Sequence, residues 1–101
     1  MYIANTSFMV DPPVHERWLE LLTKYYIPFL RERGFENPVF TRVLSADAED
    51  HFTYSLQVPV ADMEQYGRLS GELFAEYVAV ADPLFGERVV WFASLMKRVD
   101  Y

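Results

Sequence analysis

The apolar residues of this chain switch between two spacings, and the order of the switches limits the fold. Residues 2–10 alternate with the two-residue period of a β-strand, and a pair of prolines follows them. From Val14 onward, apolar residues recur every three or four positions, which predicts an amphipathic helix over about residues 12–33. Asp11 is the expected N-cap of this helix, and Pro28 is expected to kink it.

The second half of the chain shows the same two spacings. The acidic segment 47–50 predicts the turn of a hairpin, and Pro59 is expected to close the second hairpin strand. Asp62 with Gln65 three residues later resembles a capping box, and residues 82–86 predict a turn. The remaining expected elements are strands at 39–45, 52–58 and 89–99, and a helix from about residue 62 to 81.

The predicted order, strand–helix–strand–strand–helix–strand, is that of the ferredoxin-like βαββαβ arrangement. Two right-handed crossovers place both helices on one face of a four-stranded antiparallel sheet. We therefore predict the α+β class and a single domain over residues 1–101, because the chain has no linker or repeat. Gly67 and Gly71 lie in the second helix and are expected to allow it to pack closely on the sheet.

One face of this sheet carries no helix, so its composition is informative. The strand at 52–58 alternates clearly, and its apolar residues should point toward the helices. This orientation leaves Thr53, Ser55 and Gln57 on the open face, and Asn5 and Ser7 should share that side.

The last strand is apolar at nearly every position from Val89 to Met96, so both of its faces favour burial. If Trp91, Ala93 and Leu95 face the helices, an apolar patch remains on the open face; the opposite orientation exposes Trp91 and Leu95 instead. Such patches usually mark an interaction surface. In the first orientation the residues expected to form a homodimer interface are Val90, Phe92 and Met96.

Charge and composition exclude several classes of protein. A net charge of −6 leaves no cationic field for nucleic-acid phosphates. The absence of cysteine excludes disulfides, thiolate zinc sites and cysteine nucleophiles. We find no secretory signal and no apolar run of about 20 residues, so we expect no membrane association and a cytoplasmic location.

The residue pattern contains no catalytic constellation. His15 and His51 are expected to be solvated surface residues, and no cluster of ligands suggests a metal site. The acidic group around residues 47–50 lacks the glycine and the bidentate glutamate of a calcium loop. The serines have neither a glycine elbow nor a histidine with a clear route to them. We therefore expect a protein without a cofactor, and the pattern favours a binding module over an enzyme.

Several short motifs resemble a small bacterial family of unknown function within the dimeric α+β barrel superfamily. The matching segments are residues 2–11, Tyr-Ile-Pro at 26–28, Tyr-Ser-Leu-Gln at 54–57 and Val-Asp at 99–100. Together they span essentially the whole chain. The resemblance implies a homodimer in which two sheets pack face to face into a barrel, and it implies no activity.

The aromatic residues leave an alternative function open. They could line a cavity between helices and sheet in which a small cofactor-free oxygenase or isomerase acts on an aromatic ligand. Candidate ligand-facing residues are Asn5, Ser7, Trp18, Tyr54, Gln57, Tyr66 and Trp91. Some relatives in the resembled superfamily degrade haem with an Asn, a Trp and an axial His; Asn5 and Trp91 are loose counterparts. No His occurs between residues 62 and 81, so we expect no haem binding.

Overall fold

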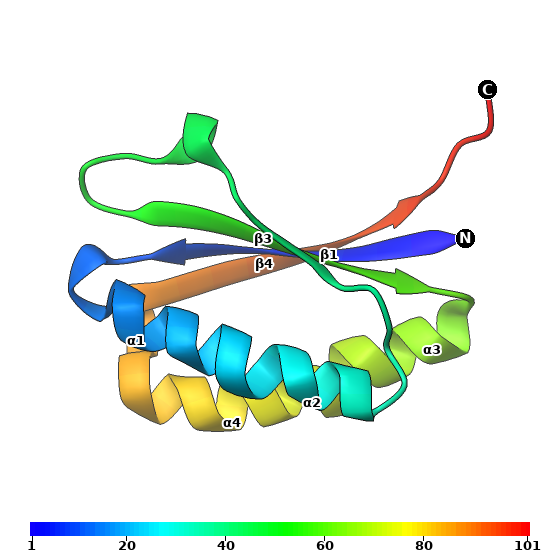
Figure 1. The fold of residues 1–101 in the computed structure, drawn as a ribbon, viewed down its shortest axis with the longest axis horizontal. Helices are drawn as coiled ribbons and strands as arrows, with labels where there is room; N and C mark the ends of the chain where they lie inside the picture. The colour runs from blue at the N-terminus through cyan, green and yellow to red at the C-terminus, as the bar shows by residue number, and fades with distance from the viewer.

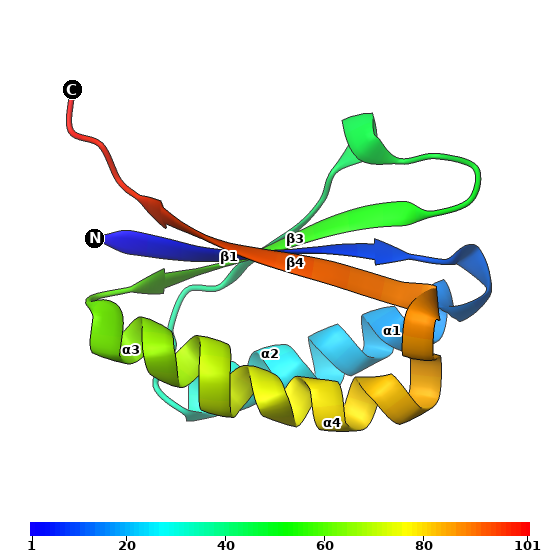
Figure 2. The ribbon, with the colours of Figure 1, turned by 180° about the vertical axis from the view of Figure 1, so that it is seen from behind.

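The computed structural model describes residues 1–101, and its strands follow one another in the predicted order (Figure 1). The strands are β1 at Tyr2–Val10, β2 at Val39–Arg42, β3 at Phe52–Val60 and β4 at Val89–Lys97. They form one antiparallel sheet in the order β2-β3-β1-β4. Both helical segments cover the same face of this sheet in both views (Figures 1 and 2), which confirms the predicted βαββαβ arrangement.

Each helical segment contains a wider π-helical turn. The first consists of a 3₁₀ turn at Pro12–Val14, α1 at His15–Glu20, the π-helical turn Leu21–Tyr26 and α2 at Ile27–Glu32. The second consists of α3 at Met63–Arg68, the π-helical turn Leu69–Leu73, α4 at Phe74–Phe85 and a 3₁₀ turn at Gly86–Arg88.

The first π-helical turn lies directly before Pro28. In a regular α-helix the proline ring would collide with the carbonyl group of Lys24, and the missing N–H would break one hydrogen bond. In the structure, the N–H of Ile27 donates to the carbonyl of Leu22, five residues back. A π-bulge is a recognised form of helix distortion. The disturbance predicted at Pro28 therefore takes the form of a locally widened turn.

The capping prediction holds at the second helix and is wrong at the first. Asp62 accepts a hydrogen bond from the backbone N–H of Gln65 at 2.8 Å. The side chain of Asp11 caps nothing, because proline at the first two helical positions supplies no N–H there. The next N–H, that of Val14, already donates to the backbone carbonyl of Asp11 at 3.1 Å.

Four element boundaries also differ from the predictions. Helix α4 continues through the turn predicted at 82–86, because its last turn tolerates Pro83 and buries Phe85 before Gly86 ends it at φ +54°. Strand β3 includes Pro59, since β2 begins opposite Gln57 and no strand pairs with Pro59 on that side. The predicted strands at 39–45 and 89–99 are shorter, ending at Arg42 and Lys97.

The expectation for the glycines of the second helical segment is wrong. Gly67 and Gly71 are exposed, and a Cβ atom added at either position would have no neighbour within 4 Å. They lie on the outer side of the segment, away from the sheet. The buried contacts of this segment come from Leu69, Leu73 and Tyr77 instead.

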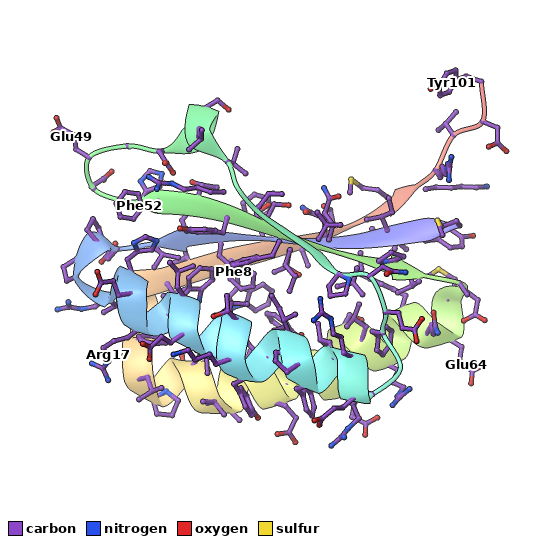
Figure 3. All side chains as sticks on the ribbon, in the orientation of Figure 1. Phe8, Arg17, Glu49, Phe52, Glu64 and Tyr101 are labelled. Atoms are coloured by element: carbon purple, nitrogen blue, oxygen red, sulfur yellow. The ribbon has the colours of Figure 1, made fainter.

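Aromatic rings fill the core between the sheet and the helices. The ring centroid of Phe8 lies 5.1 Å from that of Trp18 and 5.5 Å from that of Tyr77, and all three side chains are buried. Figure 3 shows Phe8 pointing from β1 toward the helices. Trp18 Nε1 donates a hydrogen bond to Tyr77 Oη at 2.9 Å. This bond satisfies the indole N–H and joins the two helical segments inside the core.

We predict that Tyr77→Phe lowers the free energy of unfolding by about 1–3 kcal/mol, because it leaves the buried N–H of Trp18 without an acceptor. Urea unfolding followed by circular dichroism measures the change. Tyr25→Phe is the control, since Tyr25 is exposed, and its effect should stay within about 0.5 kcal/mol. Equal values for the two variants would contradict the assigned role of Tyr77.

Candidate functional site

The register of β4 on β1 decides which side chains reach the open face. Trp91 pairs with the buried Phe8, so Trp91, Ala93 and Leu95 share the helix-facing side. The three residues predicted for the interface lie on the opposite side. Val90, Phe92 and Met96 are 45%, 58% and 38% exposed.

Polar side chains occupy the middle of the open face. Ser55 Oγ donates to Asn5 Oδ1 at 2.6 Å, and Asn5 Nδ2 donates to Ser7 Oγ at 3.3 Å. Gln57 lies opposite Asn5 in the sheet, and its side chain makes no hydrogen bond within the chain. The sequence therefore placed Asn5, Ser7, Ser55 and Gln57 on the correct face. We refer to these four residues as the polar centre.

None of the strand residues that the register places on the open face is charged. The β2–β3 loop and the last residues of the chain both rise on this side of the sheet (Figure 1). In Figure 3 the labelled Glu49 and Tyr101 project from these two segments, away from the body of the molecule. The register assigns the following residues to this face: Ile3, Asn5, Ser7, Met9, Val39, Thr41, Thr53, Ser55, Gln57, Pro59, Val90, Phe92, Ser94 and Met96.

A small cavity lies on the other side of the sheet, near the edge formed by β4. Its volume is about 70 Å³, below the roughly 300 Å³ at which ligand pockets begin. Tyr26, Tyr66, Phe74 and Trp91 contribute rings to its lining, which contains no charged residue. The rings of Phe74 and Trp91 meet edge to face, with centroids 4.6 Å apart. The space is apolar and largely closed by side-chain packing.

The seven candidate ligand-facing residues fall into three separate places. Tyr66 and Trp91 border the cavity, which Asn5 also touches although the register places its side chain on the open face. Trp18 and Tyr54 belong to the filled core, with ring centroids 5.2 Å apart. The side chains of Ser7 and Gln57 lie on the open face with Asn5. The structure therefore does not bring the seven residues into one site.

The contact between His15 and Tyr54 was not predicted from the sequence. His15 Nε2 lies 2.7 Å from Tyr54 Oη, and its ring is 4.4 Å from that of Phe52. His15 is half-buried, so the prediction of a solvated surface residue is wrong. The signal was its spacing: His15 precedes Trp18 by three positions and Leu22 by seven, which places all three on one stripe of the helix.

Burial controls the proton affinity of the groups in this region. Desolvation, with a smaller contribution from the charge of Arg42, lowers the pKa of His15 below its usual 6.5. Desolvation raises the pKa of Tyr77 to about 12 and also raises the pKa of Tyr26. Both phenols therefore stay protonated at neutral pH, and neither can act as a general base. The core provides shape and hydrogen bonds but no proton acceptor beside the cavity.

The side chains do not assemble a metal site: no group of three or more His, Cys, Asp or Glu residues comes together. The carboxylate of Asp47 in the β2–β3 loop instead accepts hydrogen bonds from neighbouring residues of the hairpin. Asp47 Oδ2 accepts from Arg42 Nε at 2.7 Å, and Asp47 Oδ1 accepts from the backbone N–H of Thr53 at 3.0 Å. The hydrogen bond from Thr53, followed by those from Arg42, lowers the pKa of Asp47.

Neither helical segment combines the length and the apolar composition needed to cross a bilayer. The model of a family described as a domain of unknown function, DUF4286, matches residues 1–99 of the chain. Among curated proteins none matches.

Solved structures with the same fold share little sequence with this chain. One, from Deinococcus radiodurans, is described provisionally as an antibiotic biosynthesis monooxygenase; it is 11% identical with a TM-score of 0.72, over 100% of this chain and 95% of its own. Two proteins from uncultured marine organisms are described as dimeric ferredoxin-like proteins. They are 14% and 12% identical, with TM-scores of 0.61 and 0.57, covering 100% and 99% of this chain and 98% and 97% of their own. These likenesses establish the ferredoxin-like fold.

We predict that His15 makes the fold less stable in mild acid. Because the pKa of His15 is lower in the folded state, the unfolded chain binds the proton more readily. The stabilisation is present above about pH 6.5 and is lost as the pH falls through the lowered pKa. Arg42 adds to this effect, whereas Glu16 and Asp47 oppose it.

Thermal midpoints measured between about pH 7.5 and 5.5 test this prediction. The wild type should lose more of its midpoint over this interval than His15→Gln, which has no group that titrates there at position 15. Parallel decreases in both proteins would assign the acid sensitivity to other residues.

Proposed function

The chain belongs to the family of the domain of unknown function DUF4286, and from its geometry we propose that it is a non-catalytic homodimeric binding module. The two copies pack their sheets against each other through the open faces. The observation that carries the proposal is the exposed apolar row Val90, Phe92 and Met96 on a sheet face without a single charge. Burying the part of Phe92 that is exposed in the subunit, 58% of the residue, contributes about 1–2 kcal/mol per subunit.

The charge of the chain favours a second copy as the partner. Charged residues make up 24% of the sequence, yet none of them lies on the open face. A strongly cationic partner would be matched by acidic side chains at the contact. Two copies that each carry −6 can approach closely where the surface between them is neutral. The solved neighbours described as dimeric add support at the level of the fold.

The proposed absence of catalysis rests on the chemistry of the buried groups. Burial raises the pKa of Tyr26 at the cavity, so this phenol stays protonated. His15, whose pKa is lowered, is hydrogen-bonded to Tyr54 away from the cavity. A cavity of about 70 Å³ is smaller than the substrate sites of most enzymes. We therefore assign the chain a binding role.

The cavity supports a second candidate function. Its uncharged lining of rings suits a flat, neutral aromatic ligand, the kind on which a small cofactor-free oxygenase or isomerase would act. Trp91 is 46% exposed and stands at the sheet edge, so a rotation of this ring would enlarge the space. This function requires the cavity to open when the ligand binds. The homodimeric binding module requires no such opening.

The homodimer predicts a mass of about twice 11.9 kDa by light scattering at micromolar concentration. Phe92→Lys should give a monomer, because the dimer would bury an unpaired ammonium group. Leu84→Lys is the matched control: Leu84 is 49% exposed on α4, away from the open face, and this variant should remain dimeric. A monomeric wild type would refute the proposed function.

The second candidate predicts that 2-naphthol raises the thermal midpoint of the protein. Ala93→Leu should abolish the increase, because Ala93 lines the cavity and the added carbons would fill it. Ala75→Leu adds the same carbons at an exposed position of α4 and should preserve the increase. An unchanged midpoint with a series of neutral phenols would remove this candidate.

A further inference from the structure

We infer that the polar centre is the self-recognition element of the dimer and meets its own copy across the two-fold axis. The inference rests on the proposed homodimer and specifies which part of the open face aligns the two copies. Interfaces usually place apolar residues in the middle and polar residues at the rim. Here the arrangement is reversed, because Phe92, Met96 and Val39 lie on the outer strands around amides and hydroxyls on β1 and β3.

The chemistry of the polar centre suits contact with an identical surface. In a two-fold symmetric interface each patch must be complementary to itself, and residues near the axis meet their own copies. An amide or a hydroxyl both donates and accepts hydrogen bonds, so each can pair with an identical group. A carboxylate or an ammonium group would repel its copy. The polar centre consists only of amides and hydroxyls.

Gln57 has the capacity for hydrogen bonds that this contact requires. Asn5 and Ser55 bond to each other, whereas the amide of Gln57 has no partner within the chain. Its side chain lies on the central strand β3, directly across from Asn5. Covering it with an apolar surface would leave both its donors and its acceptor unsatisfied, at a cost to binding. A second amide in the facing copy can accept from one N–H of Gln57 and donate to its carbonyl oxygen.

Apolar contact and polar alignment then have different roles. The apolar residues of β4 supply non-directional attraction, which allows several ways of stacking two sheets. Hydrogen bonds among amides require one register, and a single buried amide is known to select register in helical assemblies. The polar centre therefore selects one arrangement of the two sheets.

Opposite charges at position 57 test this inference directly. Gln57→Glu and Gln57→Lys each place like charges at the two-fold axis, so each variant alone should have its dimer dissociation constant raised by about a hundredfold or more. An equimolar mixture should recover a heterodimer near wild-type affinity. Sedimentation velocity measures association, and native mass spectrometry distinguishes the heterodimer by mass.

The matched control makes the same two substitutions at Leu84, which should leave each protein dimeric by itself. Thermal unfolding of each Gln57 variant checks that the subunit is folded, since Gln57 is only partly buried in the subunit. If the wild type is dimeric and Phe92→Lys dissociates it, but the Gln57 mixture does not recover, the inference is wrong and the proposed function stands. A monomeric wild type would overturn both.

Discussion

The rest of the structure depends on the pairing of β1 with a strand on each side. Every residue from Tyr2 to Val10 has a partner on β3 and another on β4. Because side chains alternate along a strand, this one segment sends Phe8 and Val10 into the core and Asn5 and Ser7 onto the open face. A shift of one residue would exchange the two sets and bury the polar side chains beneath the helices. The buried aromatic cluster around Phe8 makes that exchange costly.

The sequence predicted the features that follow from periodicity alone. The faces of β1 and β3 were correct because a two-residue alternation assigns every side chain to one of two sides, whereas the orientation of the uniformly apolar β4 stayed open until its register on β1 was known. Helix ends were less predictable. Pro83 predicts a turn in the sequence, whereas in the structure helix α4 continues past it and buries Phe85 in the core. The cap at Asp11 failed because the prolines removed the N–H groups that a cap requires. The exposure of the two glycines could not be predicted, because it depends on how the second helical segment is rotated about its axis.

The sequence predicted on which side of the sheet the candidate site residues lie, but not how deeply each side chain is buried. Tyr54 on β3 and Tyr66 on α3 both lie between the sheet and the helices, yet one lies in the filled core and the other borders the cavity. Periodicity cannot distinguish these positions, because the difference depends on which small residues, such as Ala4 and Ala93, face them. The contact of His15 with Tyr54 joins residues 39 positions apart and depends on the helix crossing β3 at one particular place.

The exposure of strand β4 affects how readily a single subunit aggregates in a cell. It is a nine-residue edge strand, and both its faces remain partly uncovered in a single subunit. The first charged residue along it is Lys97, so most of its length lacks the gatekeeper residues that protect exposed edges from aggregation. In the proposed dimer a second copy would cover the open face of β4, so a newly made subunit would be most vulnerable before it associates. Because association would be bimolecular, the concentration of the protein would influence its resistance to misassembly.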